Sequence, residues 1–487
     1  MKQLKLSTLA SLPSQIKTPK YDLQNTQCGI VHIGPGAFHR AHQAYYTELA
    51  LEKGGDWRIH GVSMRSNTLK QELSDQDNLY TLAALDNESS MQVIGAIKDL
   101  STLSNDRKDI EEALAAPETK IVTLTVTEKG YCLNAAGELD RENADIKHDL
   151  ANQQAPISAV GLLVQMLNTR MVKGLKEVTI ISCDNVTDNG KKLKKAVVQL
   201  AHEYSPELAT WIEQTIAFPC TMVDSITPAT DENFKTLVYQ TLGVFDNWPI
   251  QREAFTQWII EDEFSGPRPH WDQVGVIFTK DVSFFERAKL RVLNGTHSSL
   301  AYIGTLCGKT TVYEAISEPS IKAFIQRLLA QEIIPTLGET HDMDVEAYAQ
   351  AIIQRYENRH IRHMLSQIAW DGSQKLPFRI LGTVRDHIKQ GTSYSLLCAP
   401  IAAWCLFLAL RETDDEKLVD PLADKLLSLA KQHKGDISAL VDAVLDQKQV
   451  FAELSDNRDF RQIVQQKVQL LSTLTPDNID EVMEQLK

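Results

Sequence analysis

The chain has 487 residues, of which 43% are hydrophobic and 23% charged, as in globular proteins with two or three domains. Its formal net charge of −14 argues against non-specific binding to nucleic acid or to an anionic membrane, because both require a basic surface. Seven scattered cysteines without a CxxC pair, no run of about 18 apolar residues and no apolar leader predict a cytoplasmic protein lacking disulfides and structural zinc.

The first predicted element is a strand over residues 28–34, followed by a glycine turn and an amphipathic helix. Gly34 permits the tight turn, and Gly36 allows the backbone to approach a ligand phosphate. The third glycine of the usual dinucleotide fingerprint is missing, since Phe38 or His39 stands in its place. The incomplete pattern alone also fits a plain strand–turn–helix.

Further strands are predicted over residues 58–64, 120–127 and 178–182, each ending in a polar or glycine-rich loop. Ligands bind outside the carboxyl ends of strands in parallel α/β sheets, so this rhythm favours a dinucleotide-binding domain. No acid for the adenosine ribose follows the second strand before Glu72. Three roles therefore remain open for Arg65: stacking on the adenine, pairing with a 2′-phosphate, or lying in solvent. NAD is favoured, and NADP is not excluded.

Residues 187–279 alternate helical stretches with proline-containing turns. Asp224 lies here in an apolar, turn-bounded segment, where it either caps a helix or turn or accepts a substrate hydroxyl. From about residue 281 the strand signals fade, and helical periodicity predominates in runs such as 321–330, 395–410 and 420–485. We expect an α/β domain of the Rossmann type over residues 1–280 and a mostly α-helical domain over 281–487.

The segment KLRVLNGTH (289–297) opens the second domain, at the expected interdomain cleft. On ideal helix geometry Lys289, Asn294 and His297 fall within an arc of about 140°, with His297 between the other two. The Asn294–Gly295 pair is a poor helix former. A cation, an amide and an imidazole on one face suggest a site, although such residues also occur on solvated helix faces. Turn signals in the polar stretch 360–379 place Lys375 and Arg379 on or near a loop, as solvated cations or as anchors for an acidic substrate.

Five motifs carry a family resemblance: IGPGAFHRAH (33–42), TVTEKGY (125–131), SCDN (182–185), KLRVLNGTH and DGSQKLP (371–377). In this order the chain resembles the polyol-specific long-chain dehydrogenases, the mannitol dehydrogenase family, over essentially its whole length. The resemblance implies a metal-independent NAD(P)-dependent oxidoreductase with a small-molecule sugar acid or polyol as substrate. It also implies a monomer or a weak homo-oligomer.

The resemblance further assigns roles by motif position. Lys289 is expected as the general acid/base, Asn185 and Asn294 as the oxyanion hole, His297 as the substrate-orienting residue and Glu286 as a proton relay. Substrate contacts are expected from Asp224, Arg362, His363 and Lys375, and coenzyme contacts from Ile33, Gly34, Gly36, Ala37, Phe38, Arg65, Thr127 and Glu128.

These residue types suit the chemistry. Removing hydride from a secondary alcohol requires a base, and a lysine serves near neutral pH when desolvation lowers its pKa. The developing alkoxide requires fixed donors, which two asparagine amides supply, each worth roughly 3 kcal/mol.

The substrate is harder to choose. Gln367 stands where the mannitol branch typically has arginine, and the 362–377 segment resembles the branch acting on D-fructuronate and D-mannonate, whose cations could pair with a carboxylate. AYYT (44–47) and the loop after residue 63 resemble the mannitol/fructose branch instead. Another polyol or uronate, and a non-catalytic nucleotide-binding module, are more remote alternatives; the module would leave the joint presence of Lys289, Asn294 and Asn185 unexplained.

Overall fold

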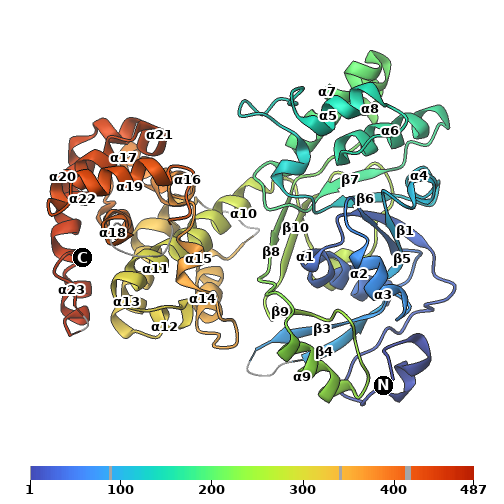
Figure 1. Ribbon diagram of the computed structural model, residues 1–487, viewed down its shortest axis with the longest axis horizontal. Coiled ribbons are helices and arrows are strands. Elements are labelled where there is room, and N and C mark those ends of the chain that lie inside the picture. The colour runs from blue at the N-terminus through green and yellow to red at the C-terminus, as the bar shows by residue number, and fades with distance from the viewer. Residues whose placement is uncertain (1, 87–89, 339–342, 412–417, 476, 487) are drawn as a thin grey trace. The chain divides into compact units, whose positions relative to one another are not determined.

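The computed structural model describes residues 2–86, 90–338, 343–411, 418–475 and 477–486. The chain divides into two compact units, Met1–Ser283 and Phe284–Lys487. The first is α/β with a parallel sheet and the second is mostly helical, as the sequence predicts (Figure 1).

The first unit is built on a five-stranded sheet of order β5-β2-β1-β6-β7, in which every neighbouring pair is parallel. Its strands are β1 (Cys28–Ile33), β2 (Arg58–Ser63), β5 (Ile97–Thr102), β6 (Ile121–Leu124) and β7 (Thr179–Ser182). Both faces are covered. Val31, Val122 and Ile180 join one hydrophobic core, whereas Ile30 and Ile121 join another. Sheets buried on both faces need continuous apolar runs, which is why most of these strands can be recognised in the sequence.

The helices of this unit are α1 (Ala37–Ala41), α2 (Gln43–Leu51), α3 (Thr68–Ser74), α4 (Arg107–Leu114), α5 (Ala144–Ala151), α6 (Ala159–Val172), α7 (Asn189–Tyr204), α8 (Pro206–Thr215) and α9 (Glu232–Leu242), with 3₁₀ turns η1 (Leu6–Ser11), η2 (Glu128–Tyr131) and η3 (Trp271–Val274). Residue types explain several boundaries. The side chains of Asn143 and Ser158 cap α5 and α6, and Gly243 ends α9 in the left-handed conformation.

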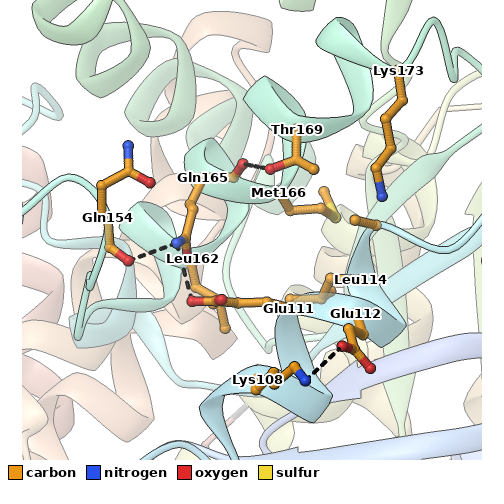
Figure 2. A pocket seen from close by; sticks show the side chains of 11 residues that line it. Lys108, Glu111, Glu112, Leu114, Gln154, Leu162, Gln165, Met166, Thr169 and Lys173 are labelled. Carbon is orange, nitrogen blue, oxygen red and sulfur yellow. Dashed lines mark hydrogen bonds and ion pairs between the residues drawn. The ribbon is translucent and has the colours of Figure 1, made fainter.

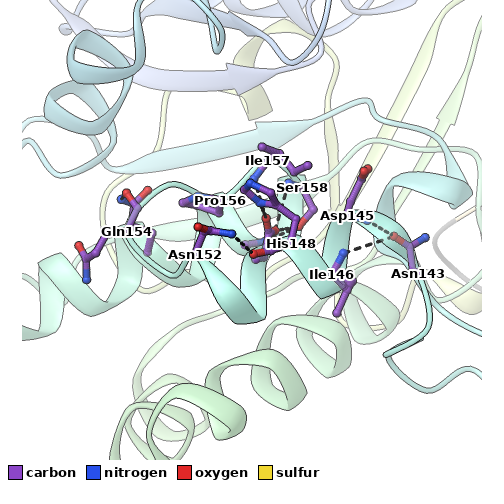
Figure 3. Close-up of polar contacts among 12 residues, drawn as sticks. Asn143, Asp145, Ile146, His148, Asn152, Gln154, Pro156, Ile157 and Ser158 are labelled. Atoms are coloured by element: carbon purple, nitrogen blue, oxygen red, sulfur yellow. Dashed lines mark hydrogen bonds and ion pairs between the residues drawn. The ribbon is translucent and has the colours of Figure 1, made fainter.

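The segment between α5 and α6 is held by local polar contacts (Figure 3). The buried Asp149 carboxylate accepts hydrogen bonds from the backbone of Ile157 at 2.7 Å and of Ser158 at 3.1 Å. Asn143 accepts from the backbone of Asp145 at 2.9 Å. Asn143 therefore fixes the start of α5, and the Asp149 carboxylate fixes the start of α6.

Two expectations for the first unit need correction. The predicted helix after Gly36 is interrupted at His42, whose backbone φ of −122° and ψ of −82° separates α1 from α2. Residues 187–279 also contain more strand than expected: β8 (Thr221–Asp224), β10 (Gln257–Glu261) and β11 (Ile277–Thr279) form one small sheet, and β9 (Ile250–Glu253) joins β3 (Tyr80–Leu85) and β4 (Ser90–Ile94) in another. Strands of three to five residues give too short a periodicity to recognise.

The second unit is helical in all its regular elements between residues 284 and 338, 343 and 411, 418 and 475, and 477 and 486. It contains α10 (Ser283–Ala288), η4 (Lys289–Asn294), α11 (Gly295–Leu306), α12 (Val312–Ile316), α13 (Pro319–Leu328), η5 (Leu329–Ile333), η6 (Ile334–Thr336), α14 (Val345–Tyr356), α15 (Leu365–Ile368), α16 (Gly372–Leu376), η7 (Pro377–Leu381), α17 (Gly382–Gln390), α18 (Ser395–Arg411), α19 (Ala423–Gln432), α20 (Ile437–Leu445), α21 (Lys448–Phe451), η8 (Ala452–Asp456), α22 (Arg458–Leu471) and α23 (Ile479–Gln485).

Helix α18 is the centre of this unit and packs against α11, α20 and α22 (Figure 1). Every residue from Leu396 to Leu408 in it is buried. A helix that is apolar all round must be enclosed by others, and this sequence property organises the helical unit. Within the described residues, no helix is long and apolar enough to cross a membrane.

The expectation that Lys375 and Arg379 lie on or near a loop is only partly right, because both lie in helical segments. A turn does occur at Asp371, whose φ is +56°, but α16, η7 and α17 then run continuously from Gly372 to Gln390. Pro377 does not end the helix, because the stretch that it opens, η7, is a π-helix. A π-type bulge is one of the ways in which a helix accommodates a proline that lacks a backbone donor.

Candidate active site

The turn after β1 has the geometry of a phosphate-binding loop. Gly34 has a φ of +91°, and a Cβ there would lie 2.3 Å from the Thr125 carbonyl oxygen, so no other residue fits. A Cβ on Gly36 would meet no protein atom closer than 3.9 Å. The space above Gly36 is therefore open, and a glycine there leaves room for a ligand rather than for protein.

His39 occupies the position of the missing third glycine. It is fully buried and stacks on His32 of β1, with 3.4 Å between ring centroids and 13° between ring planes. The third glycine of the fingerprint normally allows close packing of helix on strand. Here two flat imidazole rings achieve that packing. The incomplete fingerprint is thus compatible with the same backbone arrangement.

A cavity of about 280 Å³ opens beside this turn. Of the predicted coenzyme residues, Gly34, Gly36 and Ala37 line it. The remaining lining includes residues that were not among the predicted coenzyme contacts, all from the β2 end, α1, α3 and the loop before β9: Arg40, Ser63, Met64, Ser66, Thr68, Leu69 and Trp248. The lining combines glycines, hydroxyls and one buried cation, which fits the diphosphate and ribose of a dinucleotide.

Arg40 supplies the positive charge of this cavity. Its Nη1 donates to the Trp248 carbonyl oxygen at 2.9 Å, and its guanidinium lies over the Trp248 ring, 4.8 Å from the centroid. Burial lowers the pKa of Arg40 to about 10. No carboxylate of the described residues forms an ion pair with it, so its charge is available to an anionic ligand.

The other predicted coenzyme residues lie outside that lining. Ile33 is buried in the sheet, Phe38 is half-buried against His42, and Arg65 is exposed after β2, 3.7 Å from Asp145. Thr127 and Glu128 are exposed after β6. Thr127 has a φ of +66°, a conformation uncommon for a residue other than glycine.

Asp184, which the sequence analysis did not single out, holds the Thr127 loop against the loop after β7. Its carboxylate accepts from the Thr127 backbone N–H at 2.7 Å and from the Tyr131 hydroxyl at 3.1 Å. Burial raises the pKa of this carboxyl. Asn185 follows it directly and is exposed, so Asp184 fixes the backbone that presents Asn185. Asp224 is the last residue of β8 and is buried.

In the second unit, Lys289, Asn294 and His297 do not lie on the ideal α-helix that the sequence analysis assumed. Lys289 begins the π-helix η4, Asn294 ends it, and His297 lies in the first turn of α11. Because a π turn closes between residues five apart, Lys289 and Asn294 are separated by one such turn. Single π turns within α-helices are frequent at functional sites. Lys289 is buried, with 8% of its surface exposed.

The structure gives a reason for Gly295, a poor helix former, at the junction of η4 and α11. A Cβ there would lie 2.9 Å from the Arg379 backbone carbonyl oxygen, closer than packing allows. The glycine thus permits η7 to approach the junction of η4 and α11. This approach brings Arg379 beside the segment that carries His297.

His297 lies among aromatic and cationic neighbours. Its ring centroid is 4.8 Å from that of Tyr356 and 5.0 Å from that of His363. Burial, His363, Arg355 and Arg379 hold its pKa well below the usual range, so the imidazole is neutral at neutral pH. Its Nε2 has no hydrogen-bond partner among the described residues. A neutral ring with a vacant nitrogen can donate to or accept from a substrate hydroxyl.

The remaining predicted residues of this unit differ in exposure. Lys375 is partly buried, 3.9 Å from Asp371, and burial together with Arg379 lowers its pKa. Burial and Lys375 also lower the pKa of His363. Arg362 is exposed, and Glu286 is half-buried on α10, three residues before Lys289.

A second cavity in the first unit, of about 360 Å³, lies between α4 and α6 (Figure 2). Several of its polar groups pair with each other: Gln165 donates to Glu111 at 3.1 Å, and Lys108 lies 3.6 Å from Glu112. None of the predicted site residues lines it. In the part of the chain that the structure describes, no group of His, Cys, Asp and Glu side chains is arranged to hold a metal ion.

Comparison with known proteins assigns both units. Residues 28–273 match the mannitol dehydrogenase Rossmann domain, and residues 281–472 match the mannitol dehydrogenase C-terminal domain. The chain is 42% identical to D-mannonate oxidoreductase of Escherichia coli (93% of this chain, 95% of that protein) and 37% identical to mannitol 2-dehydrogenase of Aspergillus fumigatus (92% of each). Mannitol 2-dehydrogenase of Pseudomonas fluorescens, solved as a ternary complex with NAD and D-mannitol, superposes with a TM-score of 0.83 at 32% identity over 99% of each chain. The chain therefore belongs to the mannitol dehydrogenase family of oxidoreductases.

Proposed function

We propose that this protein is an NAD-dependent oxidoreductase that interconverts D-fructuronate and D-mannonate. The substrate is a small sugar acid, and the expected assembly is a monomer or a weak homo-oligomer. The 42% identity to D-mannonate oxidoreductase supports the proposal, as does the NAD bound by the P. fluorescens relative.

One observation in the second unit carries the choice of a sugar acid: the surroundings of His297 are cationic. Lys375 and Arg379 lie one helical turn apart, and Arg355 and Arg379 both lower the pKa of His297. Arg379 forms no ion pair among the described residues, and a uronate or aldonate carboxylate would supply its counter-charge.

A nicotinamide coenzyme bound in the first unit would supply or accept the hydride at the substrate carbon. In this proposal the Lys289 amine takes the hydroxyl proton during oxidation and returns it during reduction, with Glu286 relaying it. Asn185 and Asn294 donate hydrogen bonds to the developing alkoxide. Neutral His297 orients the substrate, and Asp224, Arg362, His363 and Lys375 contact its other groups.

In the first unit, Gly34, Gly36 and Ala37 would receive the coenzyme, with Ile33, Phe38, Arg65, Thr127 and Glu128 around it. Arg40 would pair with the diphosphate. The lining of the cavity contains no acid to reject a 2′-phosphate, so NADP is a second candidate coenzyme.

The second candidate is a mannitol 2-dehydrogenase acting on D-mannitol and D-fructose. The A. fumigatus and P. fluorescens relatives support it, at 37% and 32% identity. A neutral polyol would, however, leave Arg379 without a counter-charge among the described residues.

Initial rates distinguish the two candidates. D-Fructuronate and D-fructose are each reduced with NADH and with NADPH, and D-mannonate and D-mannitol are oxidised in the reverse assay. The proposal expects kcat/KM for fructuronate to exceed that for fructose by at least about 100-fold, as is usual when a site is built to bind a group that the analogue lacks. A preference for fructose would replace it by the mannitol candidate.

A further inference from the structure

Arg379 is a cation of the second unit that has no counter-ion among the described residues. It lies in η7, and burial lowers the pKa of its guanidinium. Its one side-chain partner among the described residues is Ser298, whose Oγ accepts from Nη1 at 3.1 Å. Within that part of the chain no carboxylate forms an ion pair with Arg379. Lys375, by contrast, has Asp371 at 3.9 Å.

A cation in this position is costly to the free protein. Arg379 is half-buried, and folded proteins normally pair charges that are partly removed from water. The neighbouring residues make an unpaired charge here less favourable, because the positive charge of Arg379 lowers the pKa of both Lys375 and His297. An anion brought by a ligand would remove this penalty.

The hydrogen bonds of Arg379 leave a specific part of the guanidinium available. Nη1 is bound by Ser298, whereas no described residue accepts from Nε or Nη2, and neither atom is among the fully buried unpartnered ones. Nε and Nη2 form one edge of the guanidinium fork. That edge matches the two oxygens of a carboxylate in a bidentate pair.

Two contacts fix where this edge lies. Ser298 follows His297 in α11, so the Nη1 hydrogen bond ties the guanidinium to the residue next to the imidazole. The glycine at 295 allows the Arg379 backbone to approach the same helix. A ligand carboxylate on the Nε/Nη2 edge would therefore lie close to the His297 ring.

We propose that Arg379, positioned by Ser298, binds the substrate carboxylate and is the residue that selects sugar acids over neutral polyols. This inference rests on the proposed function and deepens it. It assigns the main carboxylate contact to Arg379 rather than to Arg362, which is exposed. Lys375, already neutralised in part by Asp371, contributes less to this selection.

The test uses the full-length protein with NAD and compares D-mannonate with D-mannitol. In Arg379→Met, kcat/KM for mannonate is expected to fall by about 30- to 1000-fold, mainly through KM, because one partner of a buried charge pair is lost. The value for mannitol is expected to change by less than about threefold. Arg379→Lys should recover only part of the loss, since an ammonium cannot form the bidentate pair.

Two arginine controls sharpen the comparison. Arg385→Met removes an arginine of similar exposure from the continuing helix, but one that is already paired with Glu453 at 2.7 Å, and is expected to leave the mannonate-to-mannitol ratio unchanged. Arg362→Met tests whether Arg362, rather than Arg379, makes the main contact with the substrate carboxylate.

Ser298→Ala deletes only the hydrogen bond that positions Arg379 and is expected to raise KM for mannonate several-fold with kcat retained. It also provides a readout if Arg379→Met does not fold.

The outcomes separate the inference from the proposed function. If the wild-type protein does not oxidise mannonate, the proposed function fails. If it does and the Arg379 and Ser298 variants keep the wild-type mannonate-to-mannitol ratio, or if Arg362→Met carries the loss, the proposed function stands and the assignment to Arg379 is overturned.

Discussion

Lys289 is the residue on which the proposed chemistry depends. Replacing it by alanine removes the base, so kcat for the preferred substrate is expected to fall by about 10²- to 10⁴-fold. Coenzyme affinity, measured by NADH fluorescence titration, should stay within about twofold. Lys467→Ala is the matched control, because Lys467 is equally buried in the same unit, at 7% exposure against 8%. A Lys289→Ala protein that retains kcat within threefold of wild type would remove the lysine from the mechanism.

Gly295 offers a second test at the residue scale. Because an alanine Cβ would lie 2.9 Å from the Arg379 carbonyl oxygen, Gly295→Ala must push η7 away from α11. We expect a loss of about 1–3 kcal/mol in the free energy of unfolding, as for other overpacked sites. Urea denaturation measures it.

The control for this change is Gly382→Ala in the same helical stretch. A Cβ there would have its nearest neighbour at 3.9 Å, and the backbone is helical, so alanine should be neutral or stabilising by up to about 1 kcal/mol. Equal stabilities for the two alanine variants would show that the close approach of η7 is not required.

Sequence patterns identify residues better than they identify contacts. The motif at 289–297 indicates Lys289, Asn294 and His297, because a glycine and three polar groups are unusual on one helix. The role of Gly295 cannot be read from the sequence, because the backbone that approaches it, at Arg379, lies 84 positions away in the chain. The Arg379–Ser298 hydrogen bond likewise joins residues 81 apart. Contacts of that separation depend on how η7 packs, which no local pattern encodes.

At the scale of elements, we expect the turn between β1 and α1 to affect coenzyme binding separately from folding. The space beyond the Gly36 Cα is free of protein atoms to 3.9 Å, and its φ of −75° is accessible to any residue. Gly36→Val should therefore keep the wild-type unfolding midpoint while filling the cavity. We expect NADH affinity to fall at least tenfold in a fluorescence titration, since the ligand backbone approach is blocked. Unchanged affinity would place the coenzyme elsewhere.

Elements were predictable where one physical signal dominated. The apolar strands β1, β2, β6 and β7 were found because a doubly covered parallel sheet requires such runs. The edge strand β5 was missed because it contains Lys98 and Asp99. The helical stretch 372–390 was misjudged because Asp371–Gly372 and Pro377 are turn signals. Here the proline lies inside a helix, where a π turn accommodates it.

At the scale of the whole molecule, neutral buried histidines in both units make the stability of the folded protein depend on pH. Burial holds the pKa of His32 at about 3 and those of His39 and His297 well below the usual 6.5. The unfolded chain takes up these protons below about pH 6.5 and the folded chain does not. Stability contributed by these groups is therefore present above pH 6.5 and is lost as the pH falls. Glu48, whose pKa burial raises to about 7, acts in the opposite direction between about pH 7 and 4.5.

His39→Phe isolates one of these contributions. Neither ring nitrogen of His39 has a hydrogen-bond partner among the described residues, so a phenyl ring can keep the stacking on His32 without losing a bond. Each proton excluded from the folded state changes the unfolding free energy by about 1.4 kcal/mol per pH unit. Urea unfolding of wild type and variant at pH 7.5, 6.5 and 5.5 should therefore give curves that diverge below pH 6.5, with the variant losing less stability. Parallel curves would mean that His39 takes up its proton in the folded protein, and the buried stack would have to open at low pH to allow it.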